Sequence, residues 1–496
     1  MNRGQYHLLL FVLVILFSTF LFSYRILNNP PGLETDEGSI SYNSILISKN
    51  LHDQNKRFMP FFILSSDHLD WKQPVLIYST AIFFKIFGAN LINFKLVNIL
   101  YSLATVILIY ILTRLLIKEK TFALIAMILY GISPMIIITT RIGNESILPA
   151  FFGTLWLVLL TLYNRNPKRY FLILCGFALG IGFYSFKGMR IIIPVWSLMT
   201  ILLVLFKNKF NKKSFLDILA FVVTIIPYAL IIPLLENKYP GSIFDRSSIP
   251  IENYRYYLHY WLANINVFSL FSQPDIGKIY GMDYFGALLI STLPLFICGV
   301  LTMIKKTNFQ LFILITYFVT PILFGVAKST SYSHRLTGLI PIYVLVTTFG
   351  IRYLYKKLHH SELKKYFLFL GIFLITFNFL EFTNYYYIKY PKQNSTKQAF
   401  DNKYYSAFKN LSEISTTKKL NPYVQSDIYF GHNDANRFFE QAYFTGPINI
   451  WKLGDQMPAN SVLLTQLSKL DNATNLLISL DSPDTNLLIS NYDNKP

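Results

Sequence analysis

The feature that most constrains this chain is a series of long apolar runs, separated by short polar segments. A helix needs about 20 mostly apolar residues to cross the hydrocarbon of a bilayer, and most of the runs approach that length. Only 14% of the residues are charged and 53% are hydrophobic, whereas a soluble chain carries roughly a quarter charged residues. The sequence therefore predicts an all-α polytopic membrane protein with about eleven spans, the upper bound being thirteen. The predicted spans are residues 8–27, 96–117, 121–140, 147–163, 170–186, 191–206, 215–235, 285–304, 309–327, 336–354 and 366–383.

Basic residues are concentrated in the short loops between the predicted spans. The five clusters are Lys118 and Lys120; Arg165, Lys168 and Arg169; Lys207, Lys209, Lys212 and Lys213; Lys305 and Lys306; and Arg352, Lys356, Lys357, Lys364 and Lys365. A cytoplasmic N-terminus places all five on the cytoplasmic side, as the positive-inside rule requires. The net charge of +19 is then a topology signal, and we expect no nucleic-acid partner. The first run lacks a small-residue cleavage site, so we expect it to be a retained helix of a multi-pass protein of the cell membrane.

This orientation divides the chain into a membrane domain, residues 1–384, and an extracytoplasmic soluble domain, residues 385–496. Residues 28–95 and 236–284 become the two large outer loops. Residues 75–88 are apolar but too short to cross, which predicts an interfacial helix. The tail predicts a small α/β domain, because strand-like runs alternate with Pro and Asn-Asp turns around one helix-like stretch. Its strands are expected at Tyr423 to Phe430, Ser461 to Gln466 and Asn475 to Leu480, and its helix at Asn436 to Tyr443.

The first outer loop carries an acidic pair, Asp36 and Glu37, shortly after the first span ends. In one interpretation Asp36 is a helix N-cap and Glu37 lies in the first turn, where the helix dipole favours acids. In the other, Asp36 is a general base that takes a proton from an incoming hydroxyl or amine. The local pattern fits both interpretations, and the two are compatible.

Isolated cations lie on the same predicted face. Lys72, just before Pro74, fits either a phosphate ligand at the headgroup plane or an ordinary interfacial Trp-Lys anchor. Arg141 and Glu145 stand at the outer mouth of the third and fourth spans, where charges usually serve a site or pair with each other. Because these cations break the positive-inside pattern, we expect an anionic partner at the outer face. The further candidates of this kind are Lys187, Arg190, His334 and Arg335.

The second outer loop combines ionisable and aromatic residues. The ionisable ones are Asp245, Arg246, Glu252, Arg255, His259, Asp275 and Asp283. Aromatic side chains are expected at any membrane interface, and they also stack on sugar rings. No spacing matches a metal motif, and Cys175 and Cys298 lie inside apolar runs. We therefore predict no metal ligands and no required cofactor, and keep a divalent metal as the alternative.

The order and sidedness of these short motifs resemble the GT-C superfamily of membrane glycosyltransferases. The resemblance is to the branch holding the protein O-mannosyltransferases and the bacterial lipid A aminoarabinose transferases. The motifs are Asp36-Glu37, Lys72-Gln73-Pro74, Phe87-Gly88, Arg141, and His334-Arg335 before Pro341. Two departures matter: Gln73 replaces the usual first proline, and Trp71 stands where the aminoarabinose transferases have an acidic residue of a metal site. The second departure argues against a metal here.

The resemblance implies an inverting hexosyl- or pentosyltransferase that uses a polyprenyl-phosphate-linked sugar as donor. Asp36 would be the catalytic base, and Glu37 would support it or help to place the acceptor. The donor's phosphate would be held by Lys72, Arg141 and Arg335, with His334 beside them; Glu145, Lys187, Arg190 and His259 are additional candidates. The acceptor, a protein, a lipid or a glycan, is left open.

A transporter or flippase of lipid-linked glycans is the main alternative. Transporters tend to place charges near the bilayer midplane and to contain internal repeats, whereas here the ionisable residues lie at the outer ends of spans. A membrane-anchored polymerase or ligase of surface polysaccharide would share the lipid carrier and differ only in its acceptor. A scaffold whose tail binds a partner would leave the ionisable first loop unexplained.

Overall fold

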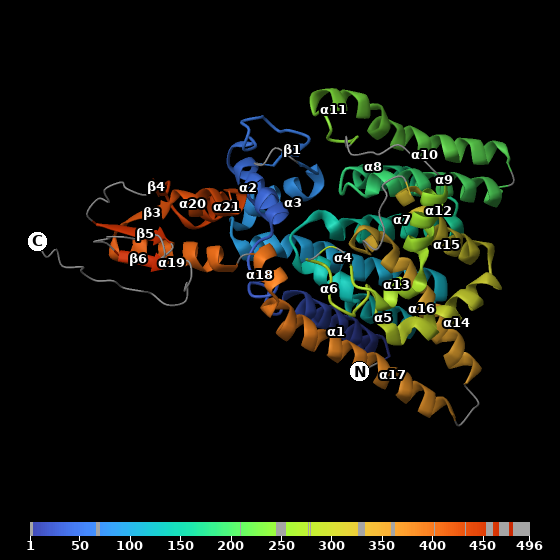
Figure 1. Ribbon diagram of the computed structural model, residues 1–496. Coiled ribbons are helices and arrows are strands. Elements are labelled where there is room, and N and C mark those ends of the chain that lie inside the picture. The colour runs from blue at the N-terminus through green and yellow to red at the C-terminus, as the bar shows by residue number, and fades with distance from the viewer. Residues whose placement is uncertain are drawn as a thin grey trace, which may run out of the picture. The chain divides into compact units, whose positions relative to one another are not determined.

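The computed structural model describes residues 3–65, 70–208, 210–244, 254–275, 277, 279–325, 333–358, 363–400, 402–431, 433–452, 460–465 and 476–479. Three of the ionisable residues of the second outer loop, Asp245, Arg246 and Glu252, lie outside these ranges. The chain divides into two compact units (Figure 1). The first comprises residues 1–24, 98–141 and 145–390, and the second comprises residues 25–97, 142–144 and 391–496.

The first unit is built from helices. Its α-helices are α1 (Arg3–Ser23), α4 (Leu91–Ile117, which begins in the second unit), α5 (Lys120–Gly131), α6 (Pro134–Arg141), α7 (Leu148–Arg165), α8 (Tyr170–Phe183), α9 (Met189–Asn208), α10 (Lys212–Leu230), α11 (Ile232–Lys238), α12 (Tyr254–Ile265), α13 (Val267–Ser272), α14 (Leu293–Ile304), α15 (Asn308–Val319), α16 (Ile340–Lys357) and α17 (Leu363–Asn384). Short helical turns are η1 (Glu145–Ile147), η2 (Ile290–Thr292), η3 (Thr320–Gly325), η4 (Ser333–Leu339), η5 (Tyr385–Lys389) and η6 (Tyr390–Lys392).

These helices confirm the predicted polytopic fold. Among the described residues, seven helices are long and apolar enough to cross a membrane. An eighth span is formed if α5 and α6, which meet at an angle of 60°, are counted together. The break precedes Pro134, which starts α6 and suits the first position of a helix because it needs no hydrogen-bond partner for its nitrogen. Shorter apolar helices coincide with the other three predicted spans, at 170–183, 290–304 and 308–322, so eleven crossings remain a prediction.

Small residues let the membrane helices approach closely. Gly299 on α14 faces the Val346 carbonyl of α16, and Gly350 on α16 faces the Leu295 carbonyl of α14. A Cβ added at either glycine would lie 1.9 Å from that oxygen, so the two backbones can pack only without side chains there. Such close approach is the usual basis of helix association in a bilayer, where burial of apolar surface gives little driving force.

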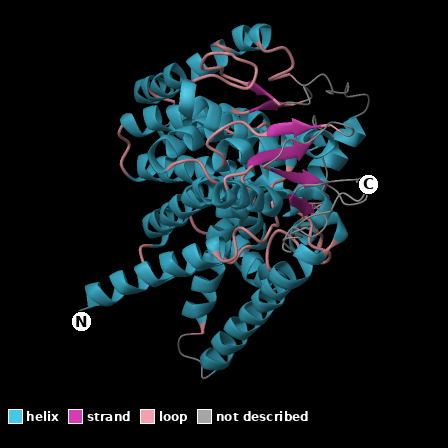
Figure 2. Cartoon of the chain, turned by 90° about the vertical axis from the view of Figure 1, so that its left-hand side faces the viewer, coloured by secondary structure: helices cyan, strands magenta, loops and turns pink. Residues whose placement is uncertain are grey.

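The second unit combines the first outer loop with the tail. The loop contributes α2 (Thr35–Asn50), β1 (Ile63–Leu64), β2 (Trp71–Lys72) and α3 (Pro74–Phe87). The tail contributes α18 (Asn394–Phe400), α19 (Asn402–Lys418), β3 (Asn421–Gln425), α20 (Ser426–Gly431), α21 (Asn433–Tyr443), β4 (Asn449–Trp451), β5 (Ser461–Thr465) and β6 (Leu476–Ser479). The four tail strands form a parallel sheet in the order β4-β3-β5-β6, labelled in Figure 1. Strands are magenta in Figure 2.

Within the described residues, the predicted strands from Ser461 to Gln466 and from Asn475 to Leu480 agree with β5 and β6, and the predicted helix agrees with α21; Gln466, Asn475 and Leu480 themselves lie outside the described residues. The expected strand from Tyr423 to Phe430 stops at Gln425, and residues 426–431 are helix α20 instead. The reason is tertiary: Asn436 of α21 donates from its side-chain amide to the carbonyls of Ile428 and Tyr429, at 2.8 and 3.1 Å, which fixes this stretch against the next helix.

An ion pair joins the loop between α4 and α5 to α16 within the first unit. Glu119 accepts hydrogen bonds from Arg352 at 2.5 and 3.0 Å, and Lys356 lies 2.8 Å from the same carboxylate. Mainly through the hydrogen bond from Arg352, the pKa of Glu119 is lowered to about 2. The pair thus fastens two predicted cytoplasmic segments to each other while the Glu119 side chain stays 38% exposed.

We expect Glu119→Gln to lower the thermal unfolding midpoint of the detergent-solubilised protein modestly. Partly exposed ion pairs contribute at most about 1 kcal/mol. Because the folded state lowers the pKa of Glu119 below its ordinary 4.5, the stabilisation is fully present above that pH and is lost as the pH falls towards 2. The difference between wild type and variant should therefore shrink over this range. Glu413→Gln, at an exposed pair with Lys409, is the control and should leave the midpoint unchanged; an equal effect of both variants would contradict the prediction.

Candidate active site

The acidic pair lies in the first turn of α2. Glu34 is the N-cap, since its carboxylate accepts a hydrogen bond from the backbone N–H of Asp36 at 2.9 Å. Glu37 accepts in return from the backbone N–H of Glu34, at 2.9 Å, which completes a capping box. The interpretation of Asp36 as the N-cap was wrong, because the N-cap is Glu34, two residues earlier, and Asp36 is the second residue of the helix. The carboxylate of Asp36 is therefore not needed to cap the helix.

Glu37 is fully buried and forms an ion pair with Lys95 of α4, whose side chain is also buried. The same carboxylate accepts from the backbone N–H of Gly143 at 2.5 Å. A buried carboxylate is tolerable only when a cation and hydrogen-bond donors surround it, and here one cation and two backbone donors do so. Sequence reasoning missed Lys95. Its one signal was a lysine just before a predicted span, where a charge usually has a functional or paired role.

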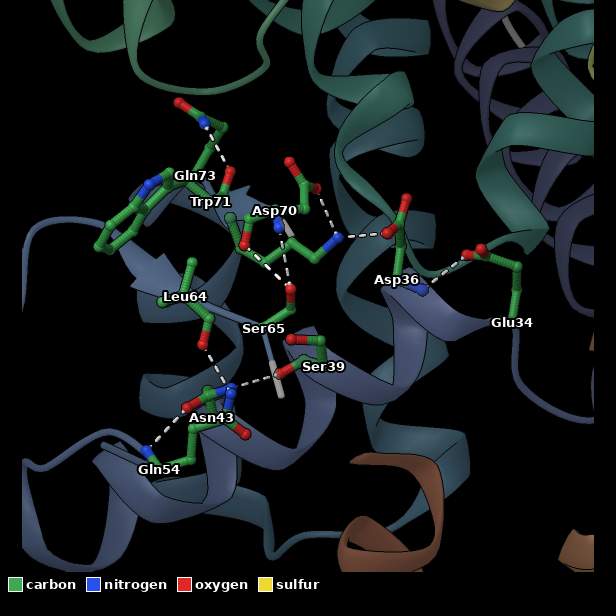
Figure 3. Close-up of polar contacts among 11 residues, drawn as sticks. Glu34, Asp36, Ser39, Asn43, Gln54, Leu64, Ser65, Asp70, Trp71 and Gln73 are labelled. Atoms are coloured by element: carbon green, nitrogen blue, oxygen red, sulfur yellow. Dashed lines mark hydrogen bonds and ion pairs between the residues drawn. The ribbon is translucent and has the colours of Figure 1, made fainter. Parts of the chain in front are cut away.

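Asp36 meets Lys72 in the same unit. β1 and β2 pair antiparallel, with Ile63 opposite Lys72, and this hairpin delivers the lysine to the start of α2. The Lys72 ammonium contacts the Asp36 carboxylate and lies 2.8 Å from Asp70 Oδ2. Asp36 and Asp70 are labelled in Figure 3. The Lys72 side chain is 4% exposed, whereas that of Asp36 is 50% exposed. The structure therefore brings a solvent-facing carboxylate and a buried cation together.

The charges of this cluster act on one another. Burial alone would lower the pKa of Lys72, but the carboxylates of Asp36 and Asp70 outweigh it and raise the pKa, so the ammonium stays charged. The pKa of Glu34 is raised well above its usual range, first by burial and then by the charges of Asp36 and Glu37. The N-cap carboxyl can therefore hold a proton at a pH at which ordinary carboxyls are ionised, which limits the negative charge at the start of α2.

The tail helix α21 packs on α2. Gly38, one turn into α2, lies against the backbone of Ala435, and an added Cβ would be 2.8 Å from the Ala435 nitrogen. The ring of Phe438 stands 6.1 Å from Phe94 of α4 and 6.3 Å from Phe84 of α3. The helix that carries Asp36 is therefore held by a segment almost 400 residues later in the sequence.

Arg141, in the first unit, is fully buried and bound to the end of α1. Its guanidinium donates to the carbonyls of Leu21, Phe22 and Tyr24 at 3.1, 3.0 and 2.6 Å. It also lies 5.2 Å from the ring centre of Tyr387. A cation is favourable at a helix C-terminus, where carbonyls lack partners within the helix. These contacts give Arg141 a structural role, and its predicted binding of phosphate stays a prediction.

His334 is held by Asp275, also in the first unit. The buried carboxylate accepts from the His334 backbone N–H at 2.8 Å and lies 2.9 Å from Nδ1 of its ring. The ring of Tyr280 stacks on the imidazole with 4.1 Å between centres. Any contact of this histidine with a ligand has to use Nε2, because Asp275 occupies Nδ1. Arg335 follows in the same short helical turn, η4.

The other predicted residues lie in the first unit and are dispersed along it. Arg190 donates to the Ile243 carbonyl at 3.1 Å, Lys187 is exposed between α8 and α9, and Glu145 starts η1. His259 is exposed on α12. Of the predicted set, the structure brings Asp36, Glu37 and Lys72 together. Within the described part of the chain, no three His, Cys, Asp or Glu side chains are grouped so as to hold a metal ion.

Comparisons with known proteins agree with the resemblance seen in the sequence. Residues 72–235 match the family described as dolichyl-phosphate-mannose-protein mannosyltransferase. The structure is similar to that of ArnT from Cupriavidus metallidurans in the apo state, with a TM-score of 0.55 at 11% identity over 94% of this chain and 87% of that chain. The chain therefore has the same fold as ArnT. The predicted GT-C resemblance is thus confirmed.

Two further solved structures are similar to this chain to a lower degree. ArnT from the same organism bound to undecaprenyl phosphate gives a TM-score of 0.52 at 12% identity, over 92% of this chain and 87% of that chain. The archaeal oligosaccharyltransferase AglB from Archaeoglobus fulgidus, in complex with an inhibitory peptide and a dolichol-phosphate, gives 0.47 at 12% identity, over 88% and 64%. No curated protein matches the sequence.

Gly38→Ala should destabilise the protein. Alanine is favoured over glycine inside a helix by about 1 kcal/mol, but the new methyl group would meet the Ala435 backbone, and overpacking typically costs 1–3 kcal/mol. Gly371→Ala is the matched control, because Gly371 is also helical and has nothing within 4 Å of its added Cβ. Thermal unfolding in detergent should show a lower midpoint for the first variant and an unchanged or higher midpoint for the second. The same response of both would exclude tight packing between α2 and α21.

Lys95→Met should cost about 3–5 kcal/mol, because it leaves the Glu37 carboxylate buried without its cation. Adding Glu37→Gln to this variant removes the unpaired charge while keeping acceptors for the two backbone N–H groups, so the double variant should be more stable than Lys95→Met alone. Denaturant unfolding of wild type, both single variants and the double variant measures this coupling. Strictly additive effects would show that the two side chains do not stabilise each other.

Proposed function

We propose that this protein is an inverting glycosyltransferase that moves a sugar from a polyprenyl-phosphate carrier to an acceptor, with Asp36 as its base. The observation that carries the proposal is the contact between Asp36, which solvent can reach, and the buried ammonium of Lys72. The similarity of the fold to that of ArnT also supports the proposal. A carboxylate that an acceptor can reach and a cation that can meet a phosphate are the two groups that this reaction needs.

In the proposed reaction, an acceptor hydroxyl or amine attacks the anomeric carbon of the donor and its proton passes to a carboxylate oxygen of Asp36. The bond between the anomeric carbon and the phosphate oxygen breaks, and polyprenyl phosphate leaves with the electron pair. One displacement at this carbon inverts its configuration. The steps at Asp36 and Lys72 support each other: once Asp36 is protonated, Lys72 has lost one counter-ion while the leaving phosphate gains charge. The ammonium is then better able to stabilise the leaving group.

Glu37 has a different role from its neighbour in this proposal. Its carboxylate is enclosed by Lys95 and by the backbone N–H groups of Glu34 and Gly143, so it does not reach an acceptor. We assign it as a positioning residue that fixes the first turn of α2 and thereby the direction of Asp36. The expectation that Glu37 places the acceptor is replaced by this role.

Two observations support polyprenyl phosphate as the carrier. They are the compared proteins and the cations of this chain. The matching family acts on dolichyl-phosphate-mannose by its description, and ArnT was solved with undecaprenyl phosphate. Lys72 is the proposed first ligand of the carrier's phosphate, with Arg335 and His334 as further candidates. Whether the sugar is a hexose or a pentose, and whether the acceptor is a protein, a lipid or a glycan, is decided by assay with defined donors.

We further propose that the reaction takes place on the outer face of the cell membrane. The basic clusters at residues 118–120, 165–169, 207–213, 305–306 and 352–365 support a cytoplasmic N-terminus. That orientation places residues 28–95, and with them Asp36 and Lys72, outside. Polyprenyl-phosphate sugars presented on that face would then be the donors.

Asp36→Asn should lower sugar transfer by about 10²–10⁴-fold, the range that a general base contributes. The assay uses the protein in lipid nanodiscs with undecaprenyl-phosphate-linked hexoses and pentoses, and follows the loss of donor in the presence of membrane acceptors. Asp427→Asn is the matched control: Asp427 is also the exposed second residue of a helix, α20, and its variant should keep full activity. Full activity of Asp36→Asn would refute the base, and failure of wild type with every lipid-linked donor would favour the transporter.

A further inference from the structure

Asp70 is the second carboxylate on Lys72, and the proposed reaction does not use it. We propose that Asp70 is a positioning residue that shares the Lys72 ammonium with Asp36, keeping Asp36 a strong base and keeping the carrier's phosphate weakly bound. This inference rests on the proposed function, because it assumes that Asp36 takes the proton and that Lys72 meets the phosphate.

The two carboxylates reach Lys72 from separate parts of the chain. Asp36 belongs to the first turn of α2, and Asp70 directly precedes β2. The Lys72 ammonium contacts Asp36 Oδ1 and donates to Asp70 Oδ2 at 2.8 Å (Figure 3). Since the Lys72 side chain is buried and those of Asp36 and Asp70 are 50% and 34% exposed, the cation can hold both acids at the edge of the solvent.

The backbone of Asp70 is fixed by Ser65. The Asp70 carbonyl accepts from the Ser65 backbone N–H at 2.9 Å and from its hydroxyl at 3.0 Å. The Asp70 N–H donates back to the same hydroxyl at 3.3 Å. These bonds continue the register of the β1–β2 hairpin, in which Leu64 lies opposite Trp71. The hairpin therefore positions Asp70 next to Lys72, in addition to the ion pair between the two side chains.

The charges define what Asp70 does. One ammonium faces two carboxylates, Asp36 and Asp70, so this group of three carries a net charge of −1. Among the residues that the structure describes, the N-cap Glu34 and Glu37 also lie beside Asp36, and the charge of Glu37 is balanced by Lys95. Without the charge of Asp70, the full attraction of Lys72 would fall on Asp36, which would bind a proton less readily.

The same change would act on the donor in the opposite direction. With Asp70 present, the Lys72 ammonium already faces two carboxylates. The three side chains together are negatively charged and repel an arriving phosphate. With a neutral residue at position 70, one ammonium faces one carboxylate and the repulsion is lowered. A slower chemical step together with tighter binding of the carrier therefore distinguishes charge sharing from simple structural support.

The test is Asp70→Asn in nanodiscs, with Asp70→Glu as the variant that restores the charge. The acid limb of the pH profile of kcat/KM should move to lower pH, because a carboxyl that loses a neighbouring negative charge gives up its proton more readily. At neutral pH kcat should fall several-fold, and undecaprenyl phosphate without sugar should bind several-fold more tightly. Asp70→Glu should return all three quantities towards wild type.

An unmoved acid limb, or carrier binding that is unchanged or weaker in Asp70→Asn, would overturn the inference. Thermal unfolding verifies that the variant is folded, and Asp70→Ser, a smaller uncharged residue, replaces it if it is not. Carrier binding needs no turnover, so it separates this inference from the proposed function. If wild type binds the carrier and the uncharged variants bind no more tightly, the inference alone fails; if wild type binds no polyprenyl phosphate, the proposed function fails and the inference with it.

Discussion

The candidate site depends on how the second unit keeps the Glu37 carboxylate away from water. A carboxylate with no exposed surface needs a cation and hydrogen-bond donors, and these come from three places in the chain: Lys95 on α4, the N–H of Gly143, and the N–H of Glu34. The first turn of α2 is thereby joined to two segments distant in sequence. Because the capping box uses the same carboxylate, the start of the helix and the burial of Glu37 cannot change independently.

Two adjacent acids consequently behave as different chemical groups. Glu37 is enclosed and paired, whereas Asp36 faces solvent and shares a buried ammonium with Asp70. Environment, more than residue type, decides which carboxyl can exchange a proton with a substrate. Lys72 is the centre of this arrangement, because it contacts both Asp36 and Asp70; in the proposed reaction its charge becomes available to the phosphate as these carboxylates release it.

Local patterns were sufficient for some of these features and insufficient for others. The apolar runs identified where the membrane helices lie, and charge and position singled out Asp36, Glu37 and Lys72. The N-cap of α2 was predicted at the wrong residue because Glu34, Asp36 and Glu37 are all acids near the start of the helix. Only the folded backbone shows that the Glu34 carboxylate accepts from the Asp36 N–H. The role of Lys95 depends on its contact with Glu37, 58 residues earlier in the sequence, and the role of Asp70 depends on its contact with Lys72, two residues later. The distant partner of Lys95 does not follow from the periodicity of the sequence.

The packing of α21 on α2 also bears on the order of biosynthesis. Residues 35–50 leave the ribosome long before residues 433–443 do. Until the later helix has been made and has docked on α2, Gly38 has no Ala435 to lie against and Phe84 and Phe94 lack Phe438. The support of Asp36 is therefore completed only after the later helix has been made, and a chain truncated before residue 433 would contain every residue of the acidic cluster without the helix that holds it in place.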